Sequence, residues 1–204
     1  MPILLVIVHL LPAAFYLAAW FASGSPAARA GAGRGGAGGA DVLLALGLAA
    51  HAASLYHEVL GGGWRLGFAA ILSATLWIGV IVLWVEGLRV GVQALRRLVL
   101  PVAAAASVLP LFFPGADISA QAARPLFVPH LIVGTLAYGV LALAALHAAL
   151  MALAERALHH GGEEADALPL ARFLEDLPPL LVLERILFRF IGLGFALLTL
   201  TAFS

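Results

Sequence analysis

Residues 127–154 read FVPHLIVGTLAYGVLALAALHAALMALA, and this run decides the fold because it contains no Asp, Glu, Lys or Arg. A helix of about 20 apolar residues is long enough to cross the hydrocarbon core of a bilayer. The chain holds six apolar runs of this kind, which cover residues 3–22, 42–60, 66–85, 98–113, 127–154 and 186–204. We therefore predict an all-α, polytopic transmembrane helix bundle of six spans, which forms a single membrane domain over residues 1–204.

The composition indicates that lipid is the solvent for most of this chain. Hydrophobic residues make up 63% of the sequence and charged residues 11%, and the formal net charge is zero. Such a chain cannot bury its apolar surface in one soluble core, so we expect the lipid bilayer as a partner. The sequence has no cysteine, which excludes disulfides and thiolate metal sites, and no basic patch that would indicate nucleic acid. No serine–histidine–carboxylate arrangement or catalytic carboxylate pair is evident, so we expect no enzyme.

The arginines are unevenly distributed between the segments that join the runs. Nine of the eleven basic residues lie in or beside the segments after the first, third and fifth runs, and the other segments hold only Arg65 and Arg124. Cytoplasmic loops carry the excess of basic residues, so we predict that both termini lie outside. We expect residues 24–40 to be a flexible Gly/Ala linker and residues 155–185 to be a cytoplasmic loop.

His130 is the first candidate for a ligand-binding residue. It lies near the start of the fifth run, which the predicted topology places at the outer membrane face. At 100° per residue, its helix face is shared by the mostly small residues Gly134, Ala137, Leu141, Ala144 and Ala148. Such a stripe lets another helix or a flat ligand approach closely. Neutral imidazole is a common ligand of metals and haem iron, and the alternative is that His130 forms a hydrogen bond to a neighbouring helix.

His51 is the second candidate, because it lies midway along the second run. Ser54 and Glu58 fall on about the same helix face, so a polar stripe is predicted to climb from the middle of the membrane to its outer face. Ionisable groups inside a membrane are functional candidates, although a hydrogen bond between helices explains them equally well. We expect Glu58 to tolerate substitution less well than Glu86, which lies at a cytoplasmic helix end.

The remaining histidines have simpler interpretations. His9 and His147 stand alone on apolar runs and are predicted to be packing residues, and His57 is predicted to be interfacial. A cluster of histidines and acidic residues spans positions 159–166 in the predicted cytoplasmic loop. Its spacing fits no established ligand pattern, so we interpret it as a solvated charge run.

Several stretches carry a family resemblance. Residues 128–138 read VPHLIVGTLAY, residues 177–189 read LPPLLVLERILFR and residues 192–201 read GLGFALLTLT. The second and third runs add AHAAS at residues 50–54, GFAA at 67–70 and LWIG at 76–79. Together they resemble the YpjD/HemX-type inner-membrane branch of the cytochrome c assembly (CcsA/CcmC-like) superfamily, over nearly the whole chain.

The resemblance implies a site. In this superfamily a histidine at the outer face pairs with a second histidine to bind haem, and His130 matches the first position. His51 matches a histidine of the second span in this branch. The resemblance thus implies His130 and His51 as cofactor-binding residues, with His130 as a ligand to haem iron. The tryptophan-rich haem motif of other members is absent. Members also continue for about two more helices, and the next outer segment carries the partner histidine, so we expect a chain truncated at its C-terminus.

The function that the resemblance implies is haem binding or handling at the outer face of the bacterial inner (plasma) membrane. Haem is the expected cofactor, and other cytochrome c assembly proteins are the expected partners. Two alternatives stay open. The first is an accessory role in divalent-cation efflux or resistance, for cobalt or magnesium, with the stripe of His51, Ser54 and Glu58 as route or sensor. The second is a non-catalytic structural membrane subunit.

Overall fold

The computed structural model describes residues 2–23, 38–61, 64–88, 93–159 and 179–203. Most of the predicted linker, at 24–37, and the charge cluster from residue 160 onward lie outside the described residues. The described helices are α1 (Pro2–Ser23), α3 (Gly39–Leu60), α4 (Phe68–Gly87), α5 (Gln93–Val108), α6 (Ser119–Ala122), α7 (Phe127–His159) and α9 (Leu180–Ala202), with a 3₁₀ turn η1 (Leu109–Leu111). The prediction of an all-α, membrane-type bundle is confirmed.

Helices α1, α3, α4 and α7 are each long and apolar enough to cross a membrane. The shorter α5 and the more charged α9 are not among these candidate spans of the described chain, so six crossings and an outside N-terminus stay predictions. Both helices begin earlier than their apolar runs. The N-terminal turns of α5 carry Arg96 and Arg97, and those of α9 carry Glu184 and Arg185. Helices α7 and α9 also extend into both ends of the segment that the sequence predicts to be a loop.

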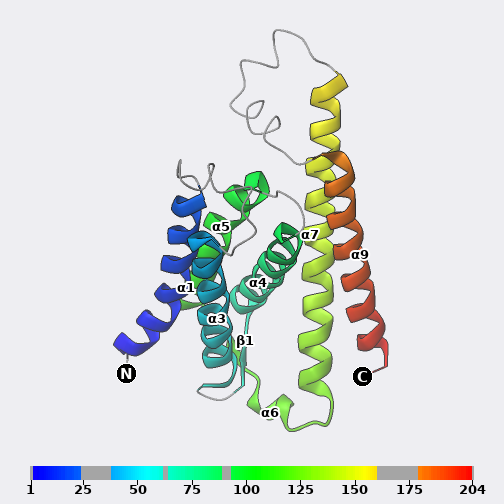
Figure 1. Cartoon of the computed structure of the whole chain (residues 1–204). Coiled ribbons are helices and arrows are strands. Elements are labelled where there is room, and N and C mark those ends of the chain that lie inside the picture. The colour runs from blue at the N-terminus through cyan, green and yellow to red at the C-terminus, as the bar shows by residue number, and fades with distance from the viewer. Residues whose placement is uncertain (1, 24–37, 62–63, 89–92, 160–178, 204) are drawn as a thin grey trace.

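Helix α4 lies at the centre of the bundle and contacts α3, α5 and α7 (Figure 1). On one side α1 packs on α3 and α5, and on the other side α7 and α9 form a long pair (Figure 1). The two chain termini lie at the same end as β1 and α6 (Figure 1). We call this the sheet end of the bundle, and the predicted topology places it outside the membrane.

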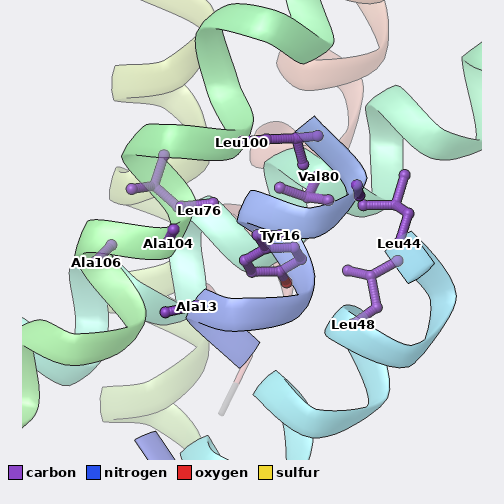
Figure 2. Close-up of a cluster of buried hydrophobic side chains, with 11 residues drawn as sticks. Ala13, Tyr16, Leu44, Leu48, Leu76, Val80, Leu100, Ala104 and Ala106 are labelled. Carbon is purple, nitrogen blue, oxygen red and sulfur yellow. The ribbon is translucent and has the colours of Figure 1, made fainter. Parts of the chain in front are cut away.

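The core consists of two clusters of buried side chains that share α4. The first joins α1, α3, α4 and α5, and Figure 2 shows Tyr16 at its centre, between Leu44 and Leu48 on one side and Leu76 on the other. Gly47 permits this packing, because a Cβ there would lie 2.9 Å from the Tyr16 ring. The second cluster joins α4 and α5 to the α7–α9 pair through Leu83, Leu95, Val140, Ala144, Val182, Leu183, Ile186 and Phe190.

A short antiparallel sheet, which the sequence did not predict, closes the sheet end. Strand β1 (Arg65–Leu66) pairs with β2 (Ala116–Asp117), with Arg65 opposite Asp117. The Ser119 backbone N–H donates to Asp117 Oδ1 at 2.8 Å. Hydrogen bonds from Ser119, and the nearby charge of Arg65, hold the pKa of the Asp117 carboxyl below its ordinary value. The sheet therefore links the α3–α4 connection to the segment before α7.

Candidate functional site

The first polar arrangement joins three helices through His51. His51 is fully buried, its Nδ1 lies 3.0 Å from the Tyr16 hydroxyl, and its Nε2 lies 2.7 Å from Ser73 Oγ. Tyr16 and Ser73 are buried as well, and they belong to α1 and α4. Because both ring nitrogens of His51 have partners, the imidazole links α1, α3 and α4 within an apolar core.

The second polar arrangement lies one heptad closer to the sheet end. His9 Nε2 lies 3.6 Å from Glu58 Oε2, so α1 and α3 meet here a second time. In an antiparallel helix pair, a step forward on one helix matches a step back on the other. His9 opposite Glu58 and Tyr16 opposite His51 are seven residues apart on each helix, so both pairs lie on one helix–helix seam. The predicted stripe of His51, Ser54 and Glu58 therefore faces α1.

His130 lies near the start of α7, at the sheet end, and its side chain is exposed. Its backbone N–H donates to the Leu126 carbonyl at 2.9 Å. Leu126 has a φ of 65°, which lies in the left-handed region that costs a leucine roughly 1–2 kcal/mol. Backbone strain of this kind concentrates at functional sites, so the turn before His130 favours a functional role there.

The small-residue stripe below His130 accommodates helix α9. A Cβ on Gly134 would lie 3.2 Å from the Thr201 side chain of α9, and a Cβ on Gly194 of α9 would lie 2.7 Å from Leu141 of α7. Ala137 and Ala144 are buried on the same face. The sequence allowed either another helix or a flat ligand on this face, and in the described residues a helix, α9, lies there.

The structure does not bring His51 and His130 together at one ligand. The ring nitrogens of His51 are occupied by Tyr16 and Ser73, and His130 is exposed on another helix. Among the residues that the structure describes, no group of three or more His, Cys, Asp or Glu side chains could hold a metal ion.

An apolar cleft lies on a different face of α7. It has a volume of about 220 Å³ and is lined by Leu55, Tyr56, Val59, Leu66, Ala70, Ile71, Ala74, Ile132, Thr135 and Leu136. Thr135 carries a hydroxyl, and it donates to the Leu131 carbonyl. Ile132 and Leu136 point away from His130 at 100° per residue, so His130 does not belong to this cleft.

Two further polar contacts, of His147 and of Glu86, lie outside the candidate site. His147 Nε2 donates to the Leu183 carbonyl at 2.9 Å, as a packing histidine does. Glu86 is fully buried, and its Oε2 lies 2.8 Å from Arg189 Nη1. Although Glu86 lies at a helix end as predicted, this burial makes it unsuitable as a tolerant control for Glu58. Arg189 itself is a third exposed.

Sequence reasoning missed several of these partners. Tyr16, Ser73 and Arg189 were not recognised, and His9 was assigned to packing. One sequence feature could have indicated these pairs. His9 and Tyr16 are seven residues apart and so share a face of α1, as His51 and Glu58 share a face of α3. The helix opposite each face could not be read from that spacing.

The fold and these buried contacts define a class: a multi-pass α-helical membrane protein whose ionisable side chains pair between helices. Residues 40–204 match the family model described as cytochrome c assembly protein, and the chain belongs to this family. Comparisons with curated proteins and with solved structures give no match. The family supports a membrane protein in cytochrome c biogenesis, a process associated with haem handling.

Proposed function

We propose that this protein binds or hands on haem at the outer face of the bacterial inner membrane, with the His130 imidazole as a ligand to the iron. It would act without catalysis, together with other cytochrome c assembly proteins. Membership of that family supports the process, and the exposed imidazole at the sheet end is the observation that carries the site. The proposal includes the YpjD/HemX-type branch, whose motifs the sequence resembles.

The described residues would offer one imidazole, that of His130, to a haem, and they do not form an enclosed haem pocket. His130 is exposed, whereas α9 fills the helix face below it and the apolar cleft lies on another face. His51 could reach iron only by giving up a hydrogen bond to Tyr16 or Ser73. A second strong axial ligand would therefore come from outside the described residues or from another molecule. A haem held by one imidazole is accessible and easily transferred, which suits a handling role.

The test is a haem titration of the purified chain in lipid nanodiscs, with an affinity tag that contains no histidine. We expect weak binding to the wild type and, once free imidazole supplies the second ligand, a six-coordinate, bis-imidazole spectrum stronger than that of empty nanodiscs given the same haem and imidazole. His130→Ala should reduce this spectrum to that of the empty nanodiscs. His147→Gln is the matched control, because it removes a buried imidazole while its amide can still donate to the Leu183 carbonyl.

The results of the haem titration distinguish His130 from other ligands and haem binding from the divalent-cation role. An unchanged spectrum in His130→Ala would show that His130 is not the ligand. Loss of the spectrum in His147→Gln alone would assign the ligand role to the buried His147. If the wild type binds no haem with or without imidazole, the haem proposal fails, and the divalent-cation role is then tested by metal sensitivity of a deletion strain.

A further inference from the structure

The His9 ring is fixed by a hydrogen bond that determines its tautomer. His9 Nδ1 lies 2.9 Å from the Leu5 carbonyl oxygen on the preceding turn of α1. A carbonyl oxygen only accepts, so Nδ1 must carry the hydrogen and donate it. In a neutral imidazole the other nitrogen, Nε2, then carries a lone pair and no hydrogen.

That second nitrogen faces a carboxylate in a buried position. His9 is fully buried, and its Nε2 lies 3.6 Å from Oε2 of Glu58, whose side chain is 10% exposed. Nε2 has no hydrogen-bond partner. A bare lone pair opposite an ionised carboxylate, away from water, would be repulsive. One proton between them makes the contact attractive, either as an imidazolium beside a carboxylate or as an imidazole beside a carboxylic acid.

Strand β1, which packs on α3 at this end, carries Arg65, and its guanidinium donates to the Gly115 carbonyl at 2.9 Å. On α3 the nearest titratable groups are His57, whose Nδ1 is buried without a partner, the exposed Tyr56, and His51, which is bonded to Tyr16 and Ser73. Helix α5 also packs on α1, and its described titratable side chains, Arg96 and Arg97, lie in its first turns at the opposite end of the bundle. Turn η1 carries no titratable side chain.

Helix α1 has a structural weak point next to this pair. Pro12 lies inside α1 and has no N–H, so it cannot bond the carbonyl of Val8. Kinks in helices concentrate at such prolines. The turns of α1 before Pro12 can therefore shift relative to α3 more easily than the rest of the helix, and His9 is the polar side chain that joins these turns to Glu58.

We propose that His9 and Glu58 form a proton-binding site that fastens the first turns of α1 to α3. With one proton bound, the pair is neutral overall and holds the two helices together. When the proton leaves, the lone pair of Nε2 faces a carboxylate, and the turns before Pro12 move away from α3. The ligand is a proton from the aqueous phase at the sheet end. This proton site does not involve haem, so its tests are independent of the proposal that His130 binds haem iron.

The first test reads the tautomer directly. Nitrogen NMR of histidine-labelled protein in nanodiscs, from about pH 5 to about pH 8, reports which ring nitrogen carries hydrogen. His9→Gln identifies the His9 signals by their loss. We expect Nδ1 of His9 to stay protonated throughout and the proton shared with Glu58 to leave as the pH rises. A His9 that carries hydrogen on Nε2 alone, with Nδ1 bare, overturns the proposal. This result needs no other variant to fold.

The second test measures whether release of the proton loosens the first turns of α1. The protection of residues 3–11 from hydrogen exchange, taken relative to the intrinsic exchange rate at each pH, should fall as the pH rises, because the folded state binds the shared proton and release of that proton weakens the contact. Glu58→Gln should abolish this pH dependence, since its amide can donate to Nε2 without a titrating proton. Glu184→Gln is the matched control, because it makes the same change at an exposed position on α9 and should leave the pH dependence intact. Equal pH profiles in the wild type and Glu58→Gln would refute the proposal.

Discussion

Replacing Tyr16 with Phe removes one hydroxyl from the centre of the first core cluster and changes little else. The hydroxyl lies 3.0 Å from His51 Nδ1, and both side chains are fully buried. Loss of a hydrogen bond that leaves a buried partner unsatisfied costs about 1–3 kcal/mol. Hydrogen bonds between membrane helices measure lower, about 0.6 kcal/mol on average with a maximum near 1.7. Ser73 still holds the other ring nitrogen, so we expect a loss of about 1 kcal/mol of unfolding free energy.

The assay is reversible unfolding of the protein in mixed detergent micelles, with wild type and variant followed by the same helical signal. Tyr56→Phe is the matched control, because it is the same chemical change at a side chain that is 68% exposed. Substitutions away from buried features stay within about 0.5 kcal/mol. If Tyr16→Phe costs no more than Tyr56→Phe, the hydrogen bond from Tyr16 to His51 does not stabilise the bundle, and the argument that His51 is held by its partners fails.

Three further predictions follow from close contacts elsewhere. Gly139→Ala should destabilise the bundle by about 1–3 kcal/mol in the same assay, because the added Cβ would overlap the Thr75 hydroxyl of α4. A neutral effect would show that α4 and α7 are less closely packed. Arg189→Ala should destabilise more than Glu86→Gln, since the first leaves a fully buried carboxylate alone and the second leaves a partly exposed guanidinium, and the reverse order would contradict the pairing. Hydrogen bonds lower the pKa of Asp117, so the stability that its carboxylate gives to the sheet is complete above the ordinary carboxyl pKa and is lost as the pH falls through the lowered pKa. Asp117→Asn should therefore remove this acid sensitivity, which hydrogen exchange of the sheet measures.

The candidate site was only partly predictable from the sequence. The stripe of His51, Ser54 and Glu58 follows from helical spacing, and the structure shows that it faces α1. His130 lies at the end of α7 as predicted, but its stripe of small residues could not reveal whether a helix or a ligand would occupy it. Thr201 of α9 answers that question at Gly134. The short sheet escaped prediction, because two-residue strands carry no usable periodicity.

Hydropathy acts locally, so the sequence alone determined that lipid is the solvent and that residues 127–154 form a long helix. The same local rule misplaced the starts of α5 and α9. Charged residues such as Arg96 lower the hydropathy of a segment, yet they are helical here because they pair with tertiary partners, as Arg96 does with Asp41 at 2.8 Å. Spacing fixes which residues share a helix face, but the helix opposite that face depends on how the whole chain packs. Tyr16 and His51, or Glu86 and Arg189, could be paired only by the tertiary structure, because each contact joins faces that are far apart in the chain.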